Sequence, residues 1–181
     1  HVIEVTAMTR RDDPIIQALH PTVHEVSLLG GPASEAEMIE MLREKGFAVR
    51  DLAVSPFSNR SHVALSLRKS HDSEPRQLLY FLLPGVPYIK HAVVVDEDVD
   101  VRDPRDIEWA ITTRFQGDDD LIVIPNMRAR SIDPSRKEGD FMTKLGLDET
   151  VPIRRRDRFK RISVPREVRE KVKKMFLQFM K

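Results

Sequence analysis

Residues 92–95, Ala-Val-Val-Val, are the feature that most constrains the fold of this chain. Valine favours strands, and no polar residue alternates with these four apolar ones. A strand without alternation must be covered on both faces, as in parallel sheets that are flanked by helices. Charged residues bound the run, with Lys90 before it and Asp96 after it. We therefore expect a buried strand over 90–96 with charged groups at both of its ends.

A second apolar run, residues 121–124, predicts another buried strand, which Pro125 ends. Pro104 lies near the first turn of a predicted helix that runs to about Phe115, between the two strands. A strand, a helix and a second buried strand form a βαβ unit, so these two strands should be parallel. The sequence thus predicts an α/β fold with an open, mainly parallel or mixed sheet, flanking helices and a C-terminal amphipathic helix.

Shorter patterns predict the remaining elements. Strands are expected over 2–7, 48–54 and 62–67, and helices over 34–45 and 78–83, with a short helix that begins near Pro14 and stops at Pro21. Ser34 and Glu37 have the spacing of a capping box, and Gly46 is a typical helix end. Gly30-Gly31-Pro32 predicts a turn, and residues 126–140 predict a long polar loop.

The last 31 residues differ from the rest of the chain in charge. Residues 151–181 hold 12 Lys or Arg and 3 Asp or Glu, whereas residues 1–150 hold 18 and 26. A helix is predicted from Val164-Pro165 to about Met180, with a basic face and an apolar face made by Val168, Val172, Met175, Phe176 and Phe179. We expect two parts, an α/β domain over 1–152 and a basic extension over 153–181 that packs on that domain or on a partner subunit.

The composition excludes several classes of protein. The chain has no cysteine, which excludes disulfides, thiolate metal sites and a cysteine nucleophile. No apolar stretch approaches the roughly 18–20 residues that cross a bilayer, and no signal peptide is visible. With 181 residues, of which 33% are charged, the chain can build one sizeable core. We expect a globular, cytoplasmic protein without a membrane partner.

Four short segments occur in order along the chain. They are Glu4-Val-Thr-Ala-Met-Thr-Arg10, Asp13-Pro-Ile-Ile-Gln17, the run from Lys90 to Asp100 with Trp109-Ala-Ile-Thr-Thr-Arg114, and Lys144-Leu-Gly-Leu-Asp148. Together they resemble the UbiD family of decarboxylases over residues 2–152, and Ser131-Ile-Asp-Pro134 fits the same pattern. The resemblance does not extend to residues 153–181.

The resemblance implies a carboxy-lyase that reversibly decarboxylates an unsaturated or aromatic acid with prenylated FMN. It also implies that the family's catalytic Glu-Arg-Glu set, and most ligands of a metal ion, lie in domains that precede the matched segment. This chain would then be the C-terminal domain, which contributes oligomerisation and closure of the active site. On that interpretation the isolated chain is inactive and binds no cofactor, and a start at His1 fits a cut or processed product.

The expected partners are the N-terminal flavin-binding domains and further copies of the chain, as a dimer or larger homo-oligomer. Lys90 is the candidate cofactor-binding residue, because a lysine before the equivalent strand contacts the flavin phosphate in the family. Thr6 and Thr9 are candidate substrate-pocket residues, because their segment adjoins the family's active site. Without the resemblance, Lys90 is an ordinary solvated strand end and the threonines are ordinary strand residues.

The acidic run after the buried strand has two interpretations. Asp96, Asp98 and Asp100 alternate, so their oxygens could suit Ca²⁺ or Mg²⁺, although Val101 and Ile107 exclude an EF-hand loop. The favoured interpretation is that these carboxylates cap the following helix and pair with Arg102, Arg105 or Arg114. No metal site is predicted.

The alternative to a decarboxylase domain is a binding module whose basic C-terminal segment contacts nucleic acid or an acidic protein. In this segment only Phe159 lies directly between basic residues, and a single aromatic side chain offers little base stacking, which does not favour nucleic acid.

Overall fold

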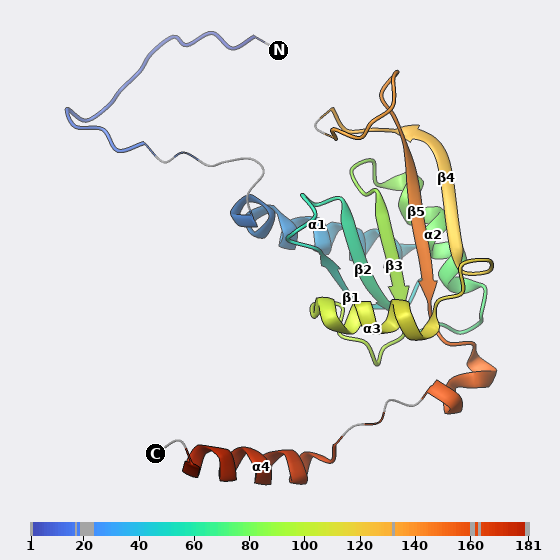
Figure 1. The fold of residues 1–181 in the computed structure, drawn as a ribbon. Coiled ribbons are helices and arrows are strands. Elements are labelled where there is room, and N and C mark those ends of the chain that lie inside the picture. Colours follow the sequence, from blue (N-terminus) through green and yellow to red (C-terminus); the bar gives the residue numbers. More distant parts are fainter. Residues whose placement is uncertain are drawn as a thin grey trace.

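Five strands form one mixed sheet in the order β1-β2-β3-β5-β4 (Figure 1). The structure is a computed structural model that describes residues 2–16, 18, 24–131, 133–159, 162 and 164–179. The strands are β1 (Val49–Val54), β2 (His62–Leu67), β3 (His91–Val95), β4 (Leu121–Arg128) and β5 (Phe141–Glu149). The central strands β2, β3 and β5 are parallel, and β1 and β4 run antiparallel at the two edges. The predicted α/β fold with a mixed sheet is confirmed.

Helices cover both faces of this sheet. The helices of the chain are α1 (His24–Glu44), α2 (Glu74–Gly85), α3 (Pro104–Arg114) and α4 (Arg166–Phe179), with a 3₁₀ helix η1 (Ile153–Phe159) after β5. α1 and α2 pack on one face and α3 on the other, whereas α4 lies away from the sheet (Figure 1). Asp103 caps α3, because its side chain accepts a hydrogen bond from the N–H of Arg105.

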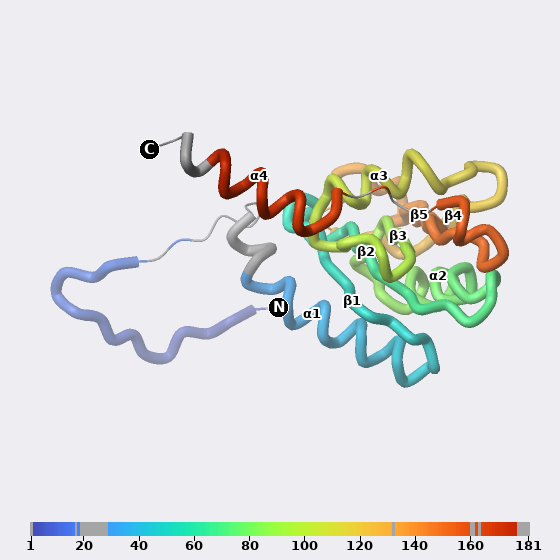
Figure 2. Tube along the Cα trace, turned by 90° about the horizontal axis from the view of Figure 1, so that it is seen from below, coloured from blue at the N-terminus to red at the C-terminus, as the bar shows by residue number. Residues whose placement is uncertain are grey.

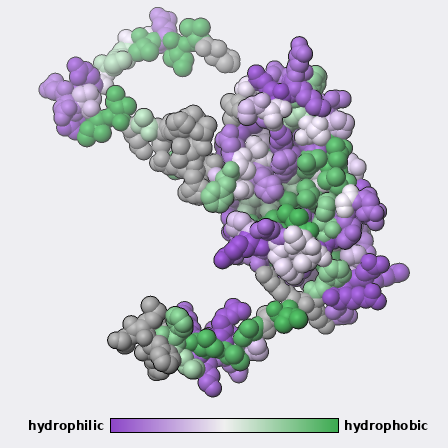
Figure 3. Space-filling view, in the orientation of Figure 1, coloured by the Kyte–Doolittle hydropathy of each residue, from purple (hydrophilic) through white to green (hydrophobic). Residues whose placement is uncertain are grey.

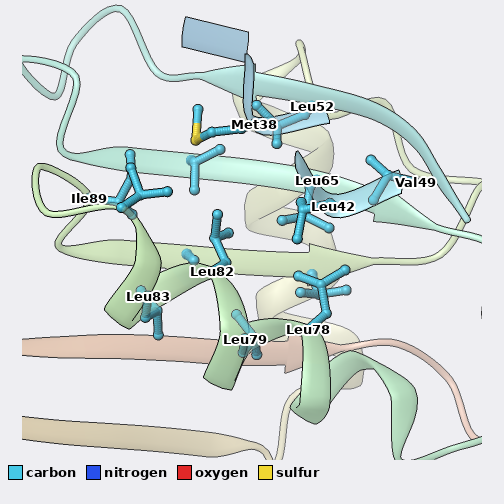
Figure 4. Packing of buried hydrophobic residues seen from close by; sticks show 14 of the residues in the cluster. Met38, Leu42, Val49, Leu52, Leu65, Leu78, Leu79, Leu82, Leu83 and Ile89 are labelled. Carbon is cyan, nitrogen blue, oxygen red and sulfur yellow. The ribbon is translucent and has the colours of Figure 1, made fainter. Parts of the chain in front are cut away.

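The larger core lies between the sheet and the helices α1 and α2 (Figure 4). α1 contributes Met38 and Leu42, and α2 contributes four leucines at helical spacing, Leu78, Leu79, Leu82 and Leu83. Each of these four leucines is fully buried, so each contributes about 1.5–3 kcal/mol to folding. The smaller core lies under α3 and includes Val93, Val95 and Ala110.

The prediction for the 92–95 run is confirmed. All four residues are buried in β3, which lies between β2 and β5 at the centre of the sheet. Ala92 and Val94 belong to the core under α1 and α2, and Val93 and Val95 belong to the core under α3. A strand that feeds both cores has no polar face, which explains the absence of alternation.

The prediction for residues 121–124 is wrong in three respects. β4 is an edge strand that pairs antiparallel with β5, so it is not the parallel partner of β3. Its side chains alternate, with Ile122 buried and Val123 53% exposed. Pro125 does not end the strand, because the pairing shifts between Ile124 and Met127 and an edge bulge tolerates a residue without an N–H.

β5 itself is absent from the predicted elements. Its buried face carries a lysine at 144 and a glycine at 146, which interrupt the apolar alternation expected of a strand. Gly146 packs directly under α2, where an added Cβ would lie 3.1–3.2 Å from methyl groups of Leu79 and Leu83. A strand that needs a lysine and a glycine at its core positions does not show a hydrophobic pattern.

The predicted turn at Gly30-Gly31-Pro32 is also wrong, because α1 continues through it and holds Pro32 inside the helix. Ser34 therefore caps nothing and donates a hydrogen bond back to the carbonyl of Gly30. The guanidinium of Arg60 occupies the space beside Gly30, where a Cβ would lie 2.9 Å from its Nη1 atom. Tertiary packing thus outweighs the local preference of Gly and Pro. Gly46 lies two residues after the end of α1 and has a φ of +89°, which fits its predicted role as a helix stop.

The N-terminal segment does not form the predicted strand. Residues 2–16 are extended, exposed and unpaired with any described strand, and they lie away from the sheet (Figure 2). Sheet strands need a neighbour to satisfy their backbone groups, and the described residues offer this segment none. Residues 14–16 and 18 are not helical, and residues 17 and 19–21 of the predicted helix lie outside the described residues.

The predicted C-terminal helix is confirmed as α4. Its apolar residues Val168, Val172, Met175 and Phe176 are 48–66% exposed, so they do not pack on the sheet. Green and purple side chains both appear along this helix in Figure 3, which reflects its amphipathic character. Among the described helices, none is long and apolar enough to span a membrane.

Candidate functional site

Lys90 lies at the edge of the sheet where the parallel strands begin. Its backbone is held on both sides, because its N–H donates to the carbonyl of Ser61 (2.7 Å) and its carbonyl accepts from Leu145 (2.9 Å). The side chain is 24% exposed, so it is largely packed on the protein but still accessible to solvent. β3 thus presents Lys90 from a fixed backbone position.

Two residues of the 129–140 loop hold the Lys90 ammonium. It donates to Oδ2 of Asp133 (3.0 Å) and to the hydroxyl of Ser135. The other oxygen of Asp133, Oδ1, accepts from the N–H of Ser135 (2.9 Å) and from its hydroxyl (2.7 Å). Burial raises the pKa of Asp133, but the hydrogen bonds from Ser135 and Lys90 outweigh it and lower this pKa to about 2. Asp133 is therefore an anion at any ordinary pH.

The surroundings of Lys90 carry further nitrogen groups. His62 and His91 are partners on β2 and β3, with ring centroids 6.2 Å apart. Burial lowers the pKa of both imidazoles; His91 lowers that of His62 further, and Lys90 lowers that of His91. Arg60 stacks on Tyr88 at 5.5 Å and bonds to Ser34 of α1. The start of the parallel strands thus gathers two cations, Lys90 and Arg60, and two imidazoles beside the carboxylate of Asp133.

The other two predicted site residues, Thr6 and Thr9, lie in the exposed N-terminal segment. Figure 1 shows this segment extended away from the sheet, so the structure does not bring Thr6 or Thr9 near Lys90. Their role as substrate-pocket residues stays a prediction.

The acidic run lies at the opposite edge, where the parallel strands end. Arg114 binds Asp98 through two hydrogen bonds (3.0 and 2.6 Å), lies 3.4 Å from Asp96 and stacks on Trp109 at 4.8 Å. The predicted pairing with Arg114 is therefore confirmed. The prediction that the acidic run caps the following helix is wrong, because Asp103 caps α3. The side chain of Arg102 pairs with Glu35 and Asp51 and not with the acidic run.

A hollow of about 240 Å³ opens at this acidic edge, lined by residues that include Asp96, Arg114 and Arg156. Oδ2 of Asp96 accepts a hydrogen bond from the N–H of Val151 (2.7 Å), whereas its buried Oδ1 accepts none from the described residues and lies 3.7 Å from Arg156. Burial raises the pKa of Asp96 in spite of that bond and of the nearby cations. No group of three histidine or acidic residues in the described part of the chain is placed to hold a metal ion.

Sequence reasoning missed the partners of Lys90. Asp133 and Ser135 are 43 and 45 residues away, in a segment that carried no predicted element. The signal was present as Asp133-Pro134-Ser135, a run of three residues that favour a tight turn. A turn of this kind predicts a fixed carboxylate but not the side chain that it will meet.

Comparisons with known proteins match the chain to one family. The family model for the 3-octaprenyl-4-hydroxybenzoate carboxy-lyase C-terminal domain matches residues 27–148. An anhydromevalonate phosphate decarboxylase from Methanothermobacter thermautotrophicus is 34% identical over 90% of this chain and 38% of its own length. A gallate decarboxylase from Lactiplantibacillus plantarum is 31% identical over 88% of this chain and 36% of its own length. The chain thus spans under two-fifths of these relatives.

Solved structures show the same relationship. The UbiD-class enzyme HmfF from Pelotomaculum thermopropionicum, solved in complex with FMN, has a TM-score of 0.72 and 31% identity to this chain. That similarity covers 78% of this chain and 32% of the HmfF chain. An apo 3,4-dihydroxybenzoic acid decarboxylase from Enterobacter cloacae has a TM-score of 0.70 at 29% identity, over 76% of this chain and 31% of its own. The chain belongs to the UbiD family, and its residues 27–148 match the C-terminal domain of that family.

Proposed function

We propose that this chain is the C-terminal domain of a decarboxylase that uses prenylated FMN, and that Lys90 binds the phosphate of that cofactor. An evolved form of the relative HmfF was solved in complex with prenylated FMN. The cofactor would supply the electron-accepting chemistry that allows an unsaturated or aromatic acid to lose CO₂. The catalytic acids and bases would come from other domains.

Lys90 fits a phosphate in its chemistry. Its ammonium has three donors, of which two are used by Asp133 and Ser135, and the described residues provide no third acceptor. A compact, partly exposed ammonium suits a phosphate oxygen. The observation that carries the proposal is an ammonium fixed by two hydrogen bonds, whose third N–H has no acceptor among the described residues.

The test is Lys90→Ala in the complete enzyme, with flavin affinity measured by fluorescence. Riboflavin lacks the phosphate, so the variant should weaken FMN binding and leave riboflavin binding unchanged. Loss of one charge-assisted hydrogen bond corresponds to a decrease of roughly tenfold or more. Equal FMN affinity in both proteins would remove Lys90 from the cofactor site. Lys137→Ala, a change of an exposed lysine nearby, serves as the control.

We assign the exposed apolar surfaces to subunit and domain contacts. Ile3, Met8 and Ile15 of the N-terminal segment are 80–86% exposed, and α4 has its apolar face free of the sheet. Surfaces of this kind fit flavin-binding domains and a second copy of the chain. Phe176→Glu in the complete enzyme should reduce the oligomer mass in light scattering, whereas Lys173→Glu on the same helix should not. An unchanged mass in both variants would contradict a role for α4.

Thr6 and Thr9 then line the substrate pocket once the N-terminal segment meets the other domains. Thr6→Val keeps the shape of the side chain and removes its hydroxyl. We expect an altered ratio of kcat/KM between acids that differ in ring hydroxyl groups, with Thr112→Val on α3 as the control. A constant ratio would mean that the Thr6 side chain does not contribute to substrate choice. The isolated chain should show no decarboxylation at all.

A further inference from the structure

Lys90 is a flexible side chain, yet the structure holds it at its tip. A lysine side chain has four rotatable bonds, and holding its ammonium against a ligand costs conformational free energy unless other groups have already ordered it. Here Asp133 and Ser135 both contact the ammonium, from a loop 43 residues further along the chain. The ordering is therefore supplied by the domain before any ligand arrives.

The contact is built from a rigid turn. Asp133 and Ser135 enclose Pro134, which fixes its own φ, and Asp133 Oδ1 accepts both the N–H and the hydroxyl of Ser135. The carboxylate thus cannot rotate away without losing two hydrogen bonds. Its side chain is 17% exposed, so water offers it little replacement.

We propose that Asp133 and Ser135 are positioning residues that hold the Lys90 ammonium in the place where it meets the cofactor phosphate. This inference rests on the proposed contact between Lys90 and the phosphate. Neither residue needs to touch the cofactor, since each acts through Lys90. The third N–H of the ammonium is the one left for the phosphate oxygen.

Asp133 could instead compete with the cofactor, if its carboxylate occupied the Lys90 ammonium and repelled the phosphate. The two roles predict opposite changes in FMN affinity when the carboxylate is removed. Coulomb attraction alone would make FMN bind more tightly when the carboxylate is removed. Positioning makes FMN bind less tightly, although a negative charge has been lost.

The experiment measures FMN and riboflavin affinity for Ser135→Ala and Asp133→Asn in the complete enzyme. Asparagine has one acceptor oxygen, so it cannot serve Ser135 and Lys90 together. We expect each variant to weaken FMN binding about three- to tenfold, the cost of ordering one long side chain, with riboflavin unchanged. Ser135→Thr keeps the hydroxyl and should restore FMN affinity. In a Lys90→Ala background, neither change should have a further effect.

Asp140→Asn is the matched control. Asp140 lies in the same loop and pairs with Arg136 at 3.2 Å, so the change removes the same charge without touching Lys90. Unchanged FMN affinity in Ser135→Ala and Asp133→Asn, or tighter binding in Asp133→Asn, would overturn the positioning role while Lys90→Ala still weakens FMN binding. No effect of Lys90→Ala would instead refute the proposed phosphate contact itself. Thermal unfolding of each variant separates these outcomes from a loss of fold.

Discussion

The ammonium of Lys144 donates a hydrogen bond to the carbonyl oxygen of Leu83 at the C-terminal end of α2, at 2.5 Å. A second bond, of 2.7 Å, reaches the carbonyl of Val86. Helix ends leave carbonyl groups without intrahelical partners, and here a strand residue satisfies two carbonyls at that end. Lys144 is fully buried, so β5 and α2 are joined by a polar contact inside the apolar core.

This contact predicts a pH dependence of stability. Burial lowers the pKa of Lys144 to about 8, below that of a lysine in the unfolded chain. The unfolded chain therefore binds more protons between about pH 8 and 10.5, and the free energy of unfolding should rise with pH across that window. The rise is up to about 3 kcal/mol in urea denaturation at several pH values. Lys144→Met should abolish it, and Lys137→Met, at an exposed site, should not.

Glu149 predicts a dependence of the opposite sign. Both carboxylate oxygens are buried without a hydrogen-bond partner among the described residues. Burial and the nearby Asp148 raise its pKa to about 8, although Arg114 opposes them. The folded chain binds the extra proton between about pH 4.5 and 8, so stability should fall as pH rises through this window. Glu149→Gln should be more stable than the parent at pH 7, by up to about 3 kcal/mol.

The control for that variant is Glu138→Gln, at an exposed position of the 129–140 loop. Its stability at pH 7 should match that of the parent. Equal stability of Glu149→Gln and the parent at pH 7 would mean that Glu149 is ionised there and finds a counter-charge.

Arg114 should be the most stabilising charged residue at the acidic edge. Its side chain is 1% exposed and binds Asp98 through both Nη atoms. Asp98 is 49% exposed and water can solvate it, but Asp96 is 13% exposed and would lose a buried counter-charge, so Arg114→Met should cost about 1–3 kcal/mol in chemical denaturation. Arg105→Met breaks the exposed pair with Asp103, which water and salt screen, and should cost much less than Arg114→Met. Similar losses in the two variants would contradict the importance of burial.

Two glycine substitutions should act in opposite directions. Gly146→Ala places a methyl group against Leu79 and Leu83, so overpacking should lower stability by about 1–3 kcal/mol. Gly85→Ala lies in the last turn of α2, where a Cβ meets nothing within 4 Å and the next residue is not a proline. The gain in helix propensity should raise stability by roughly 0.5–1 kcal/mol. Thermal unfolding midpoints that move in the same direction would refute this account of the packing.

The sequence by itself determined the elements whose signal is local. The unbroken apolar run of β3 required cover on both faces, and the 3.6-residue spacing in α4 required a helix. The charge at each end of β3 was equally visible, which is why Lys90 and the acids could be chosen as candidates. The order of short motifs indicated the family, which the family model later matched.

Tertiary structure decided what depends on distant neighbours. β4 does not pair with β3, because β5 lies between them and β4 pairs antiparallel with β5. The sequence does not indicate β5, because packing against α2 places a lysine and a glycine at its buried positions. α1 runs through Pro32 because packing across its length outweighs one broken turn. The partners of Lys90 come from 43 and 45 residues away, and no local pattern records such separations. Side-chain chemistry could be proposed from the sequence, but only the fold decides which charges meet, because Coulomb and hydrogen-bond energies depend on distance in space.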